Sequence, residues 1–148
     1  MQYNGNRDMS IIINCTLGLI ILPYEATQES PPPFWETELN EIHNLPPFKL
    51  EIFEPIKSIK KSITKYHPKT LAVLLMKIRH GLAHQHIESV NEEGKFAGVI
   101  IRNYHKQANQ QRLDLQIYFS QQELKEFALF IANEYLKNRT PAKALNQI

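Results

Sequence analysis

The sequence predicts a mainly α-helical fold: a bundle of about four to five helices with a small antiparallel β-sheet inserted before the C-terminal helix. Two patterns predict it. Apolar residues recur at helical spacing over most of the chain, and between residues 87 and 120 they alternate as in β-strands. The chain has 148 residues, of which 43% are hydrophobic and 22% are charged. A chain of this length and composition can bury one core, so residues 1–148 are predicted to form a single domain.

The first predicted helix is the apolar stretch IIINCTLGLIIL at residues 11–22, which we expect to end at Pro23. It is too short to span a bilayer, which takes about 20 residues, so no membrane contact is expected. Because it is apolar on nearly all sides, other helices and a partner subunit are expected to cover it. Cys15 is expected to be a small buried hydrophobe, which fits a reducing, cytoplasmic compartment.

The next two segments differ in charge, although the formal net charge of the chain is only +2. Residues 24–48 are acidic, and the proline-rich runs SPPPFW and LPPF predict a loop with at most short helical turns. A basic helix should follow, starting near Glu54 and Pro55, with isoleucines from Ile52 to Ile63 on one side. Four lysines lie largely on its other side: Lys57, Lys60, Lys61 and Lys65. They are candidate RNA-binding residues, and a merely solvated helix face is the alternative.

A stronger helix is predicted from about Lys69 to His84. Its core stripe consists of Leu71, Leu74, Leu75, Ile78 and Leu82. A second face carries small residues and a methionine, which allow another helix to approach closely, and Gly81 is expected to mark a bend. This second face comprises Ala72, Met76, Arg79, His80 and Ala83.

Strands are predicted after His86. IESV and FAGVIIRNY flank the turn NEEG, and RLDLQIYFS at residues 112–120 alternates as a further strand, with a polar loop at residues 105–111. The stretch SQQELKEFALFIANEYLKN is predicted to form the last helix. Ser120 and Glu123 form a capping box at its start, and residues 139–148 are expected to be a loose tail.

Chemistry-bearing residues concentrate in RHGLAHQH at residues 79–86. Histidine can accept or donate a proton near neutral pH, and arginine offers charged donors to phosphate oxygens. On a straight helix Arg79 and His84 lie roughly 140° apart, so a bend or a two-fold assembly is needed to bring them together, and we prefer the assembly.

The segment RHGLAH resembles the R-x4-6-H signature of the HEPN superfamily (higher eukaryotes and prokaryotes nucleotide-binding domain). The layout also resembles stand-alone bacterial members. Active HEPN proteins are metal-independent endoribonucleases that form dimers with a composite site. The resemblance therefore implies that Arg79 and His84 are the catalytic pair, that His80 supports them, and that RNA and a second copy of the chain are partners. His86 lies past the motif and is expected to contact RNA at most.

Other readings of these residues stay open. Arg79 can pair with a glutamate such as Glu88, and His84 can interact with the carbonyl groups at the end of its helix. His80 and His84 lack a nearby carboxylate, and no zinc-finger spacing appears, so no metal or cofactor is expected. Two other functions remain: a non-catalytic RNA- or nucleotide-binding module, and a dimerising toxin or defence protein with an antitoxin or nucleotidyltransferase partner.

Overall fold

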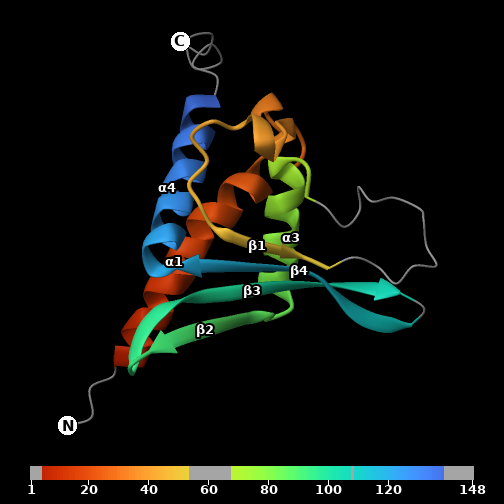
Figure 1. Ribbon diagram of the computed structural model, residues 1–148. Coiled ribbons are helices and arrows are strands. Elements are labelled where there is room, and N and C mark those ends of the chain that lie inside the picture. Colours follow the sequence, from red (N-terminus) through yellow and green to blue (C-terminus); the bar gives the residue numbers. More distant parts are fainter. Residues whose placement is uncertain (1–4, 54–67, 108, 139–148) are drawn as a thin grey trace.

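The computed structural model describes residues 5–53, 68–107 and 109–138 (Figure 1). Among the described elements, an α-helix and two short 3-10 helices come first. A strand, a second α-helix, three more strands and a last α-helix follow. The bounds are α1 (Gly5–Ala26), η1 (Pro33–Glu36), η2 (Leu39–Glu41), β1 (Lys49–Ile52), α3 (Leu71–Ala83), β2 (Ile87–Glu92), β3 (Lys95–Gln107), β4 (Gln110–Ser120) and α4 (Gln121–Asn138).

The described residues form two layers. The four strands make one antiparallel sheet in the order β1-β4-β3-β2. The three α-helices pack against one another on one face of this sheet and run across the strands (Figure 1). The prediction of a mainly helical bundle of four to five helices is therefore wrong, because the described part of the chain has three helices and a sheet that forms a complete layer.

Two strand features account for the error. Strand β1 lies in a region whose isoleucines suggested a helix, yet Lys49–Ile52 pairs with β4 in register Lys49↔Tyr118 to Ile52↔Leu115. Strands β3 and β4 also continue through the predicted polar loop, pairing as far as Gln107↔Gln110. Backbone hydrogen bonds hold a β-hairpin whatever the polarity of its side chains, so the apolar alternation underestimates its length.

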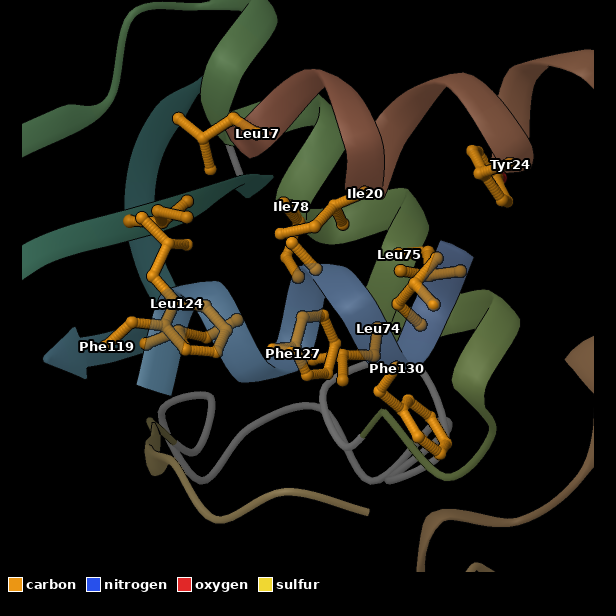
Figure 2. Close-up of a cluster of buried hydrophobic side chains, with 14 of the residues drawn as sticks. Leu17, Ile20, Tyr24, Leu74, Leu75, Ile78, Phe119, Leu124, Phe127 and Phe130 are labelled. Carbon is orange, nitrogen blue, oxygen red and sulfur yellow. The ribbon is translucent and has the colours of Figure 1, made fainter. Parts of the chain in front are cut away.

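The core lies between the sheet and the helices. Figure 2 shows part of this core, with Leu17 and Ile20 from α1, Ile78 from α3, Phe127 from α4 and Phe119 from β4. The rings of Phe119 and Phe127 pack on each other, with centroids 5.1 Å apart. The predicted stripe of α3 is confirmed: Leu71, Leu74, Leu75 and Ile78 are fully buried, and Leu82 is partly buried and packs against them. The capping box of α4 is confirmed as well: Glu123 N–H donates to Ser120 Oγ at 3.1 Å, and Ser120 N–H donates to Glu123 Oε1 at 2.9 Å.

Helix α1 does not end at Pro23 as predicted but continues to Ala26. Thr27 then ends it, because its hydroxyl donates to the Pro23 carbonyl at 2.8 Å and accepts from Trp35 Nε1 at 2.8 Å. Cys15 is exposed, so its expected burial is also wrong. Leu19 and Leu22 are 47% and 67% exposed, which leaves one side of α1 apolar and uncovered by the described residues.

Gly81 lies inside α3, which runs on to Ala83, and the bend expected there stays a prediction. The glycine is the point where α3 approaches β3 most closely. A Cβ atom at this position would lie 2.7 Å from the Arg102 carbonyl oxygen and 2.8 Å from Ile101 Cγ2. Such distances are shorter than van der Waals contact, so any side chain here would push the helix away from the sheet.

Three predictions fall outside the described residues or remain untested. The basic helix with Lys57, Lys60, Lys61 and Lys65, and the tail at residues 139–148, lie outside them. The assignment of the whole chain to one domain stays a prediction. The acidic, proline-rich segment is irregular apart from η1 and η2, as expected, although residues 24–26 belong to α1. Among the described helices, none combines the length and apolar character that crossing a membrane requires.

Candidate functional site at the end of helix α3

The C-terminal end of α3 carries the residues singled out in the sequence. Arg79, His80 and His84 are all exposed there, whereas the opposite side of the same helix is buried in the core. The Arg79 Nε atom forms an ion pair with Glu25 Oε1 of α1, and the two side chains are 44% and 39% exposed. Glu88 is therefore not the partner of Arg79; it pairs instead with Arg102 Nη1 at 2.8 Å.

The turn that ends α3 is a Schellman motif with His84 as the C-cap residue. The Gln85 N–H donates to the Leu82 carbonyl at 3.1 Å, and the His86 N–H donates to the Gly81 carbonyl at 2.7 Å. Gln85 adopts a φ of 58°, the left-handed conformation that this motif requires at that position. The Arg102 N–H then donates to the His86 carbonyl at 2.9 Å. Both histidines are thus held by the backbone of α3 and β3.

Three rings are in contact at this turn: those of His84, His86 and Tyr104. The His84 and His86 rings are stacked, with centroids 5.9 Å apart and an interplanar angle of 28°. The His86 ring and the ring of Tyr104 on β3 meet edge to face, with centroids 4.5 Å apart and an interplanar angle of 67°. The ring of His84, the predicted proton-transfer residue, is therefore connected through His86 to Tyr104 on the sheet.

A buried polar network lies beside the site, and sequence reasoning missed it. Lys77 Nζ donates to Asp114 Oδ2 at 2.8 Å, and Asn103 Nδ2 donates to Asp114 Oδ1 at 2.8 Å. Lys77 and Asp114 are only 3% and 4% exposed. Lysine and aspartate are almost never buried unless they are paired, and nothing in the local sequence reveals a pairing across 37 positions.

A β-bulge explains how Asp114 reaches Lys77. The register changes from Asn103↔Leu115 to Tyr104↔Leu113, so Asp114 is an extra residue in β4. A bulge of this kind redirects a side chain. Here the carboxylate of Asp114 turns toward α3, on the side where Leu115 is also buried.

The surroundings of His80 depress its basicity. Partial burial lowers the pKa of His80 from its usual 6.5, and the positive charges of Arg79, His84 and Lys77 lower it further, while Asp114 acts in the opposite direction. The imidazole is therefore mostly neutral at neutral pH. A neutral imidazole can accept a proton or a hydrogen bond, which fits the supporting role expected for this residue.

The structure brings some of the predicted residues together and separates others. His80 lies within electrostatic reach of both Arg79 and His84. Arg79 is paired with α1, whereas the His84 ring stacks on His86. No three His, Cys, Asp or Glu side chains in the described ranges are grouped so as to hold a metal ion. Within one chain the arginine and His84 thus have different neighbours.

We expect Lys77→Met to lower the free energy of unfolding by about 3–5 kcal/mol, because it leaves Asp114 charged and buried without a partner. Urea denaturation at neutral pH measures this loss. Adding Asp114→Asn should restore part of it, since the amide is neutral and its oxygen still accepts from Asn103. Lys125→Met on the exposed side of α4 is the matched control and should change stability little. A Lys77→Met loss as small as the control would contradict the structural role of the pair.

Arg79→Ala should raise the pKa of His80, because it removes one of the charges that disfavour the imidazolium. NMR titration of the histidine resonances measures this, and Arg112→Ala on β4 is the control. His80 also links stability to pH. Its folded-state pKa lies below the unfolded value, so this contribution is fully present above pH 6.5 and is lost as the pH falls through the folded pKa. An unchanged pKa in Arg79→Ala would contradict the closeness of the two charges.

Residues 1–142 match the model of a protein family described as HEPN pEK499 p136. No curated protein and no solved structure matches the chain. The family match covers nearly the whole sequence, including RHGLAH at the end of α3, and it supports a nucleotide- or RNA-related function in general. The chain belongs to this HEPN family.

Proposed function

We propose that this protein is a metal-independent endoribonuclease, with Arg79 and His84 as its catalytic pair and His80 as the supporting residue. The observation that carries the proposal is the placement of the motif. In a chain of a HEPN family, the arginine and the histidines lie exposed at the end of α3, and the Schellman turn and the core hold them.

The residue types suit the cleavage of RNA by its own 2′-hydroxyl. A base removes the 2′-OH proton, the 2′-oxygen attacks phosphorus, and the bond to the 5′-oxygen breaks as that oxygen is protonated. His84 transfers protons, and Arg79 stabilises the additional negative charge on the phosphorane. The exposed Arg79–Glu25 pair is worth about 1 kcal/mol at most, so a phosphate can displace Glu25 from the guanidinium.

A two-fold dimer accounts for the separation of Arg79 from His84 and is part of the proposal. Leu22 lies one turn before Glu25, so the exposed apolar side of α1 adjoins the Arg79–Glu25 pair. Leu129 and Leu136 of α4 are also 47% and 59% exposed, and α4 packs on α1. Burying these leucines against a second copy would bring two sets of motif residues toward one interface.

The cleavage test uses purified protein and single-stranded RNA in the presence of EDTA. We expect cleavage, with 5′ products that end in a cyclic phosphate or a 3′-phosphate. Arg79→Ala removes charge stabilisation and His84→Ala removes proton transfer, so each should lower the rate by about 10²–10⁴-fold. His43→Ala is the matched control, because His43 is exposed in the loop after η2, and η2 is hydrogen-bonded to the segment that begins α3, away from the motif.

Two results would overturn the proposed ribonuclease activity. One is cleavage that requires a divalent metal, and the other is wild-type rates in both Arg79→Ala and His84→Ala. RNA binding without cleavage would instead identify a binding module, and the absence of both would favour a dimerising toxin or defence protein that acts through another partner.

Leu22→Glu should convert the dimer into monomers, because a two-fold interface would receive two charges at once. Sedimentation analysis measures the mass, and circular dichroism should still show a folded protein, because Leu22 is 67% exposed in the single chain. Gln122→Glu, on the exposed side of α4, is the control and should remain dimeric. A wild-type protein that is monomeric at micromolar concentration would contradict the composite site.

A further inference from the structure

The rings of His84, His86 and Tyr104 form a row that begins at the motif and ends on β3. Tyr104 is 37% exposed, His84 is exposed and His86 is partly buried. In β3 the alternate residues Val99, Ile101 and Asn103 are buried, so Tyr104 points to the opposite face of the sheet, away from the helices. The row therefore passes around the edge of the sheet and presents the last ring to solvent.

The backbone that carries each ring is held by hydrogen bonds, and the rings contact one another. The Schellman turn holds His84 and His86, and the hydrogen bond from Arg102 N–H to the His86 carbonyl fixes His86 beside β3. Tyr104 lies in the longest strand, paired with Leu113 of β4. Rings held in place in this way lose little conformational entropy when a planar ligand stacks on them.

The charge around Tyr104 indicates what that ligand is. Between Arg102 and Asp114 the sequence contains lysine, arginine and histidine but no acidic residue. Lys106 lies two residues beyond Tyr104 on the same side of β3, and it is exposed. Arg112 is exposed on β4, but it pairs with His105 and therefore lies on the other face of the hairpin from Tyr104 and Lys106. This arm of the hairpin projects beyond the helices, toward the right of Figure 1.

We propose that His86 and Tyr104 form a stacking platform for a nucleobase of single-stranded RNA next to the cleaved phosphate, and that Lys106 binds the phosphate that follows. Base-on-aromatic stacking beside a cationic strand is how proteins hold single strands, and paired bases are not available for it. The inference rests on the proposed function. It adds a substrate-binding surface and a preference for unpaired RNA.

Binding is tested with a fluorescent single-stranded 2′-O-methyl oligonucleotide, whose blocked 2′-oxygen prevents cleavage. Tyr104→Ala should weaken binding by about 5- to 100-fold, whereas Tyr104→Phe keeps the ring and should stay within about twofold of wild type. A 2-aminopurine base in the oligonucleotide should be quenched by wild type and by Tyr104→Phe but not by Tyr104→Ala. His86→Asn, which removes the second ring, should also weaken binding. Thermal unfolding verifies that each variant is folded.

The interaction with the phosphate has its own measurement. Lys106→Gln should reduce the salt dependence of binding by about 0.7 in the logarithmic slope, because one phosphate is no longer neutralised. Lys125→Gln on α4 is the matched control and should leave the slope unchanged. An unchanged slope in Lys106→Gln would overturn the role of Lys106.

The two proposals fail in different ways. If wild type cuts RNA but Tyr104→Ala and His86→Asn bind the oligonucleotide as tightly as wild type, the platform is wrong and the ribonuclease stands. If wild type cuts no RNA but Tyr104→Ala loses binding and quenching while Tyr104→Phe keeps them, the platform stands and the ribonuclease is wrong. Equal affinity for a single strand and for the matching duplex would also overturn the platform.

Discussion

The site depends on how α3 is fastened to the sheet, and the buried Lys77–Asp114 pair is the polar part of that attachment. Lys77 lies one turn before His80, and Asp114 holds both Lys77 and Asn103. Next to this network, Gly81 lets the helix backbone approach the Arg102 carbonyl. A buried charge pair requires good geometry to offset its desolvation, so the end of α3 has little freedom to shift relative to β3 and β4.

This attachment has consequences on both sides of the helix. The positive charge of Lys77 contributes to the lowered pKa of His80, although Asp114 offsets part of the effect. The close contact at Gly81 brings the following turn to β3, where the His86 carbonyl accepts from Arg102. The packing of α3 on the sheet therefore sets both the electrostatic surroundings of His80 and the position of His86.

The parts of the fold with a strong local pattern could be predicted from the sequence. The stripe of α3, the Ser120–Glu123 capping box and the existence of three of the strands are examples, because each depends on residues close together in the chain. Strand β1 and the continuation of α1 past Pro23 could not be predicted, since pairing with β4 and packing of Ile20 and Tyr24 decide them. In the site, Arg79, His80 and His84 stood out by composition. Lys77 did not, because a bulge in β4 brings Asp114 to it. The contact of Tyr104 with His86 could not be predicted either, because it depends on a turn in the left-handed conformation at Gln85.

The edges of the sheet limit how copies of this protein can associate. At one edge β1 has only four residues, with Lys49 and Glu51 exposed. At the other edge β2 carries exposed Glu88 and Glu92, and its pairing with β3 is interrupted between Val90 and Asn91. Short, charged or irregular edge strands discourage the addition of further strands from another chain. The sheet is thus protected against growing into a continuous intermolecular sheet, and the helical layer is the more suitable surface for contact between subunits.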